Sequence, residues 1–166
     1  MLSFLPRYIF PKITDISPDF LKKLDVQLLL MDYDNTILPY TKDEADEALL
    51  TWLQEMDKAG ISLCIVSNTH KKRAPNFAQA HGLPCVTHAG KPGTRGIRQA
   101  LLRFSCDKKH TAMVGDQIFT DVLGANLAGV TSIAVASIHN HNFWLKLRHL
   151  FELPFLALAH KRRVKP

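Results

Sequence analysis

Short apolar runs, separated by segments with the spacing of amphipathic helices, constrain the fold of this chain more than any other feature. Five runs read as strands: VQLLLMD (26–32), ISLCIVSN (61–68), PCVTH (84–88), HTAMVGD (110–116) and TSIAVAS (131–137). A run that is apolar along most of its length is typical of a strand buried on both faces, and strands that alternate with helices form parallel sheets. The sequence therefore predicts an α/β protein with a Rossmann-like, three-layer fold around a mostly parallel sheet.

The intervening segments carry local signals that begin and end helices. In residues 42–60, acids crowd the first turns, an apolar stripe follows at helical spacing, and Gly60 comes at the end. Acids favour the N-terminal end of a helix, and glycine favours its C-terminal cap. Shorter helices are predicted at 17–24, 73–82, 94–104 and 118–129.

The composition indicates one globular domain. The chain has 166 residues, 46% hydrophobic and 22% charged, which allows a sizeable core. Its three cysteines form no C-x-x-C pair and begin no C-x5-R loop, which favours a reduced, cytoplasmic chain and argues against a cysteine-based phosphatase. No apolar run reaches about 18 residues, so no membrane-spanning helix is predicted. The first ten residues lack a basic start and read poorly as a signal peptide.

The net charge of +6 is concentrated at the C-terminal end of the chain. Residues 26–138 hold equal numbers of acidic and basic side chains, whereas residues 139–166 carry six basic side chains against Glu152 alone. We therefore divide the chain into an aromatic, proline-rich segment (1–25), a neutral core (26–138) and a basic amphipathic segment (139–166). Such a basic segment is suited to an anionic partner.

Polar residues follow four of the predicted strands, at the point where each strand ends. Because the carboxyl ends of parallel strands share one edge of the sheet, we expect these side chains to converge there. They are Asp32, Asp34 and Thr36, then Ser67 and Asn68, then Lys91, and finally Asp116 and Asp121.

This set of groups suits phosphoryl transfer. Clustered carboxylates repel one another and need a cation, and their oxygens are the ligands that Mg²⁺ prefers. One carboxylate can attack phosphorus and form an aspartyl-phosphate, and a neighbour can protonate the leaving oxygen and then activate water. A lysine and a hydroxyl can hold the remaining phosphoryl oxygens.

The four motifs D-x-D-x-T, S-N, K-P and G-D-x4-D, in that order after successive strands, resemble the haloacid dehalogenase (HAD) superfamily of phosphatases. The resemblance covers roughly residues 26–137. It implies that Asp32 is the nucleophile and a metal ligand. It also implies that Asp34 is the general acid/base, with its backbone carbonyl on the metal, and that Asp116 is a further ligand of Mg²⁺.

The same resemblance implies that Ser67, Asn68 and Lys91 bind the phosphoryl group, with Thr36 and Asp121 in support. Each has a plainer alternative: Asp121 as an acid in a first helical turn, Ser67 as a turn hydroxyl, Lys91 as a loop lysine, and Thr36 and Asn68 as residues that only shape their loops. The basic run at 71–73 reads as a solvated helix start or, alternatively, as a contact to a phosphate-rich substrate.

The segments that carry cap domains in this superfamily are short here, so the site is expected to be capless and open. This resembles HAD subclass IIIA and, with the aromatic, proline-rich start, the bacterial YqeG-type branch, which is similar to the phosphatidylglycerophosphate phosphatases of mitochondria and photosynthetic organisms. The implied reaction is hydrolysis of phosphatidylglycerophosphate to phosphatidylglycerol. A phosphoprotein, nucleotide or sugar phosphate, or a binding role without turnover, is the alternative.

The apolar and basic faces of residues 139–166 resemble an interfacial segment that lies on anionic lipid. The expected location is therefore cytoplasmic, with possible peripheral contact to the inner face of the membrane. Packing of the same segment on the domain or on a second copy is the alternative, and nucleic-acid binding is disfavoured because no recognisable module is present.

Overall fold

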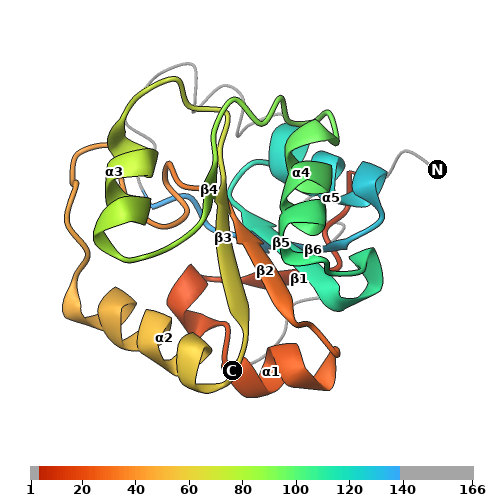
Figure 1. Ribbon diagram of the computed structural model, residues 1–166, viewed down its shortest axis with the longest axis horizontal. Coiled ribbons are helices and arrows are strands. Elements are labelled where there is room, and N and C mark those ends of the chain that lie inside the picture. Colours follow the sequence, from red (N-terminus) through yellow and green to blue (C-terminus); the bar gives the residue numbers. More distant parts are fainter. Residues whose placement is uncertain (1–3, 139–166) are drawn as a thin grey trace.

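The computed structural model describes residues 4–138, and its helices and strands alternate along most of the chain (Figure 1). The strands are β1 (Tyr8–Phe10), β2 (Leu28–Met31), β3 (Ser62–Val66), β4 (Cys85–Val86), β5 (Thr111–Gly115) and β6 (Thr131–Val135). The α-helices are α1 (Pro18–Lys23), α2 (Glu47–Lys58), α3 (Arg73–Ala80), α4 (Arg95–Phe104) and α5 (Leu123–Ala128). Two 3₁₀ turns, Ile13–Asp15 and Lys108–His110, and a π-helical turn, Ile118–Val122, complete the elements.

The six strands form one sheet in the order β1-β6-β5-β2-β3-β4, and every neighbouring pair is parallel. The predicted parallel α/β fold is therefore confirmed. Strand β2 lies between β5 and β3, with Leu30 in register with Met113 on one side and Cys64 on the other. Because β2 is central, the residues that follow it lie in the middle of the carboxyl edge of the sheet.

Alternate residues of each strand contribute to two separate cores, one on each face of the sheet. Leu29 and Met31 pack with α1, α2 and α3, while Leu28 and Leu30 pack with α4 and α5. Figure 1 shows this three-layer arrangement, with α1, α2 and α3 on one side of the sheet and α4 and α5 on the other. Burial on both faces explains why β2 is apolar at every position.

Strand β1 is a finding that the sequence pattern did not predict. Tyr8–Phe10 pairs with Ile133 to Val135 of β6 at the edge of the sheet, and the ring of Phe20 in α1 packs edge-on against both Tyr8 and Phe10. The strand is only three residues long and is followed by Pro11, so its periodicity is too short to recognise. The aromatic N-terminal segment thus extends the sheet of the core.

No cap domain interrupts residues 32–91, all of which are described. Helix α2 alone connects β2 to β3, and only α3 and β4 lie between β3 and Lys91, so the predicted capless arrangement is confirmed. Helix α2 begins at Glu47, five residues after the predicted start, because the side chain of Asp46 caps it by accepting a hydrogen bond from the Leu49 amide.

Within residues 4–138, no helix is long and apolar enough to cross a membrane. The basic amphipathic segment predicted at 139–166 lies outside the described residues.

Candidate active site

The polar residues that follow the strands converge at the carboxyl edge of the sheet, as predicted. Most of them line a cavity of about 430 Å³, namely Asp32, Asp34, Ser67, Asn68, Lys91 and Asp121. A larger hollow, of about 520 Å³, lies around Ser62 at the opposite end of β3 and is lined by several leucines. We place the active site in the smaller cavity because the clustered carboxylates and the buried lysine are there.

Lys91 lies between two buried carboxylates at the centre of the site. Its Nζ donates to Asp32 Oδ1 at 2.5 Å and is 2.8 Å from Asp121 Oδ1, and its side chain is only 1% exposed. Burial acts to lower the pKa of Lys91, but attraction from Asp121 and Asp32 outweighs it and the pKa is raised. Lys91 is therefore a permanently charged ammonium that its two partners hold in place.

Burial raises the pKa of Asp32 to about 7, although Lys91 opposes that shift. The main cause is desolvation of the carboxylate, and repulsion from the nearby Asp121 carboxylate adds to it because one ammonium faces both acids. The excess negative charge favours either a proton or a cation at this position.

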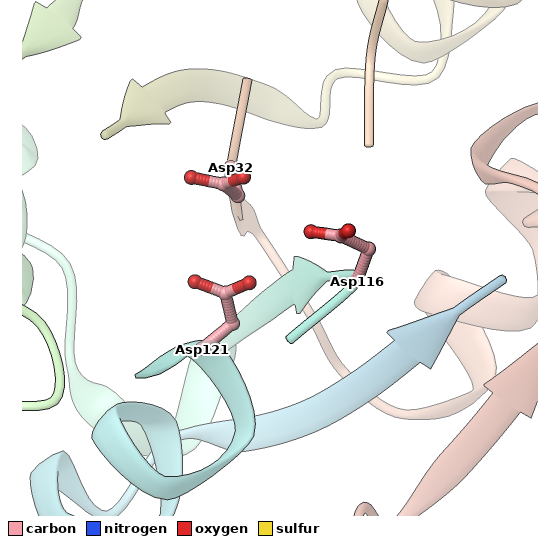
Figure 2. A group of neighbouring side chains, drawn as sticks. All are labelled: Asp32, Asp116 and Asp121. Atoms are coloured by element: carbon pink, nitrogen blue, oxygen red, sulfur yellow. The ribbon is translucent and has the colours of Figure 1, made fainter. Parts of the chain in front are cut away.

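Three carboxylates could provide the ligands of that cation. Oxygens of Asp32, Asp116 and Asp121 all lie within 4.8 Å of one another. Figure 2 shows the three side chains facing a common space, with Asp32 beyond β2, Asp116 beyond β5 and Asp121 on the following turn. Thr36 Oγ1 lies 3.4 Å from Asp116 Oδ1 and donates to it, which is consistent with the supporting position predicted for Thr36. A cluster of hard oxygen ligands fits Mg²⁺.

The cluster has one carboxylate more than the expected ligand set. Asp121, predicted to support the site, belongs to it, while Asp34 was expected to reach the metal through its backbone carbonyl and its carboxylate lies outside the cluster. Asp121 also accepts a hydrogen bond from the Gln117 backbone amide at 3.1 Å and pairs with Lys91. Asp121 therefore pairs with Lys91 and also belongs to the carboxylate cluster.

The π-helical turn Ile118–Val122 and Gly115 together allow Asp121 to lie beside Asp116. The wide turn brings the chain back over the end of β5, and a Cβ atom at position 115 would overlap the Asp121 carboxylate. Turns of this kind are frequent at functional sites. Asp121 is only 2% exposed, so it is not an ordinary solvated acid at a helix start.

The two residues after β3 occupy different positions in the site. Ser67 is 2% exposed, lines the cavity, and its Oγ accepts a hydrogen bond from the Thr69 amide at 3.2 Å. The side-chain amide of Asn68 donates to the Lys91 carbonyl at 2.9 Å and accepts from the Lys91 amide at 2.8 Å. The Asn68 side chain, expected at the phosphate, therefore also positions the backbone of Lys91.

Asp34 lines the same cavity but is paired with an arginine that the sequence analysis did not single out. Arg73 Nη1 is 2.9 Å from Asp34 Oδ1, and both side chains are largely buried. Burial raises the pKa of Asp34, and Arg73 opposes the shift. The only signal for Arg73 in the sequence is its place in the basic run at 71–73, which reads equally well as a solvated helix start.

The fold agrees with that of a known HAD hydrolase. Residues 88–142 match the HAD-hydrolase-like family. The solved structure of a HAD-superfamily hydrolase from Ehrlichia chaffeensis superposes with a TM-score of 0.54 at 16% identity, covering 79% of this chain and 98% of that one.

Relatives identified by sequence indicate which kind of HAD hydrolase this chain is similar to. The chain is 33% identical over 135 residues to the Bacillus subtilis (strain 168) protein named "Probable phosphatase YqeG", covering 81% of this chain and 78% of that protein. It is 26% identical over 140 residues to the chloroplastic phosphatidylglycerophosphate phosphatase 1 of Chlamydomonas reinhardtii, covering 79% of this chain and 52% of that protein. The chain therefore belongs to the HAD superfamily, in its YqeG-type branch, and it is a phosphatase.

Proposed function

We propose that this phosphatase is a Mg²⁺-dependent phosphomonoester hydrolase that acts through an aspartyl-phosphate on Asp32. The observation that carries the proposal is the buried arrangement of Asp32, Lys91 and Asp121 beside Asp116. Lys91 engages Asp32 Oδ1, so we assign the attack on phosphorus to Oδ2. A nucleophilic carboxylate held this firmly needs little reorganisation to reach the substrate.

In the first step, Asp32 attacks phosphorus, a phosphorus–oxygen bond to Asp32 forms, and the bond to the leaving alcohol oxygen breaks. Asp34 donates its proton to that oxygen. In the second step, Asp34 takes a proton from water, the water oxygen attacks phosphorus, and the bond to Asp32 breaks to release inorganic phosphate. Lys91 and the Ser67 hydroxyl hold the phosphoryl oxygens during both steps.

Asp32, Asp116 and Asp121 would hold Mg²⁺, and the backbone carbonyl of Asp34 is a further candidate ligand from the family resemblance. Bound there, the cation would neutralise phosphate charge and let an anionic carboxylate approach an anionic ester. The close approach of the three carboxylates supports this assignment.

For the substrate, we propose phosphatidylglycerophosphate, with hydrolysis of its terminal phosphate to give phosphatidylglycerol. Two observations support it: the similarity to the chloroplastic enzyme of that name, and a site that no cap covers within residues 32–91. An open site accommodates a headgroup that stays attached to a bilayer. Contact between residues 139–166 and anionic lipid remains a prediction from the sequence.

The test compares phosphate release from phosphatidylglycerophosphate in liposomes with release from a panel of soluble phosphoprotein, nucleotide and sugar phosphate substrates, each with Mg²⁺. We expect the highest kcat/KM on the lipid, and loss of turnover on every substrate in the Asp32→Asn variant. Preference for a soluble metabolite would contradict the lipid assignment and leave the chemistry intact. Wild-type turnover by Asp32→Asn would contradict the chemistry itself.

A further inference from the structure

Arg73, the first residue of α3, contacts a segment about 30 positions earlier in the chain. Its Nε donates to Asp43 Oδ1 at 2.6 Å, and its Nη2 donates to the carbonyls of Pro39 and Lys42 at 3.0 and 2.5 Å. The remaining nitrogen, Nη1, donates to Asp34 Oδ1 at 2.9 Å. All three guanidinium nitrogens are therefore engaged, and they join Asp34 to residues 39–43.

The guanidinium also lies over the face of an aromatic ring. Its central carbon lies 5.4 Å from the ring centre of Tyr33, which is fully buried and packs against Phe77 of α3 at 5.6 Å. A cation near an aromatic face gains additional stabilisation, and the flat guanidinium suits that position. Arg73 thus has a defined orientation even though its side chain is 19% exposed.

The segment that Arg73 holds forms part of the wall of the active site. Tyr40, within residues 39–43, lines the same cavity as Asp32 and Asp34 and is 46% exposed. The two backbone carbonyls bound by Arg73 flank Tyr40 in the chain. In other members of this superfamily a cap could supply such a wall, whereas here a loop tied down by one arginine supplies it.

We propose that Arg73 is a positioning residue for the phosphatase reaction, which fixes the carboxyl group of Asp34 and holds residues 39–43 against the site. The inference rests on the function proposed above for Asp34. Because Arg73 occupies Oδ1, the proton that Asp34 exchanges with the leaving oxygen is carried by Oδ2. A lysine could keep the charge but could not form this set of directed bonds, since only the guanidinium presents a rigid fork of donors.

The test uses two esters that differ in how strongly they need a proton from Asp34. The leaving group of glycerol 3-phosphate is glycerol, whose alkoxide is too basic to depart without that proton, whereas p-nitrophenyl phosphate releases p-nitrophenolate, which is stable without it. We expect Arg73→Lys to lower kcat/KM for glycerol 3-phosphate by about 100-fold, which is within the usual contribution of general acid catalysis. For p-nitrophenyl phosphate, we expect the same variant to lower kcat/KM by less than about 10-fold. Equal losses on both esters, or no loss on either, would overturn the proposal.

Three further variants separate positioning from other effects. Lys72→Gln, which removes the neighbouring exposed charge, should leave both esters unaffected. Asp43→Ala removes one anchor whose own side chain is 76% exposed, so it should fold normally and show a smaller loss of the same selective kind. If Arg73 acts through Asp34, the double variant Arg73→Lys/Asp34→Asn should be no slower on glycerol 3-phosphate than Asp34→Asn alone.

The outcome for Asp34→Asn distinguishes an error in the role of Asp34 from an error in the role of Arg73. If this variant hydrolyses glycerol 3-phosphate at the wild-type rate, then the role proposed for Asp34 is wrong. If it is inactive while Arg73→Lys and Asp43→Ala behave as wild type, then only the role of Arg73 is wrong.

Discussion

At the scale of single residues, the arrangement around Lys91 determines the chemistry that Asp32 can perform. Two buried carboxylates share one ammonium, so the site carries an uncompensated negative charge when no cation is bound. Burial of the Asp32 carboxylate, with repulsion from Asp121 added, raises its pKa to about 7, so a proton on Asp32 accommodates the charge at lower pH. A bound cation would replace that proton and leave the carboxylate ionised and ready to attack.

This charge balance predicts how the stability of the cation-free protein depends on pH. The pKa of Asp32 rises from 3.8 to about 7 on folding, so the folded state binds an additional proton between those values. Because the folded state holds this proton more tightly, the free energy of unfolding is higher at low pH and decreases as the pH rises towards 7. Thermal unfolding in EDTA should therefore show Asp32→Asn gaining stability relative to wild type from pH 4 to 7, and a constant difference above that range.

The matched control for this measurement is Asp15→Asn, which removes a carboxylate that lies near Lys12 and outside the carboxylate cluster. Its difference from wild type should not follow the same course with pH. A constant difference between Asp32→Asn and wild type from pH 4 to 8 would show that Asp32 has an ordinary pKa.

At the scale of elements, the π-helical turn Ile118–Val122 brings Asp121 next to Asp116, although the two acids are five residues apart in the chain. The turn depends on Gly115 at the end of β5, because no side chain can occupy the space that the Asp121 carboxylate fills. This short wide turn therefore places one member of the carboxylate cluster, as well as connecting β5 to α5.

Replacing this glycine should damage the site and leave the sheet intact. In Gly115→Ala the added methyl group displaces Asp121, so Lys91 loses one partner and the carboxylate cluster loses one member. We expect Mg²⁺ affinity to fall by about 10- to 100-fold, as it does when residues that support a metal site are changed. Titration calorimetry measures the affinity and circular dichroism checks the fold. Unchanged affinity in a folded variant would contradict the role of Asp121.

At the scale of the whole molecule, the site is held by both layers of helices. Asp32 follows a strand that is packed on both faces, Arg73 comes from the layer of α1, α2 and α3, and Lys91 precedes α4 in the opposite layer. The active site thus exists only when the two cores are both formed. Its ligands should accordingly stabilise the entire fold.

We therefore predict that Mg²⁺ raises the thermal midpoint of the wild-type protein. A ligand that binds only the folded state stabilises it by about 2.7 kcal/mol when its concentration is 100 times its dissociation constant. The gain should be much smaller in Asp116→Asn, which keeps the buried lysine and its partners but lacks one ligand. Differential scanning fluorimetry with Mg²⁺ and with EDTA measures it, and equal midpoints for wild type in both would contradict a cation site.

The sequence alone predicted most of the site because its key residues directly follow apolar strands. Asp32, Ser67 and Asp116 each come within one residue of a strand end, and the parallel topology brings strand ends together. Arg73 could not be predicted in this way. Its partners are carbonyls and acids of a loop about 30 positions earlier, and no local pattern encodes a contact between segments that meet only in the folded chain.

The sequence by itself determined the alternation of strands and helices, the absence of a cap in residues 32–91 and the gathering of acids at one edge of the sheet. These follow from burial and from local chain geometry. The tertiary structure decided which acids lie together. Asp121 joins Asp32 and Asp116 because the π-helical turn returns over Gly115, while Arg73 pairs with Asp34 and contacts residues 39–43.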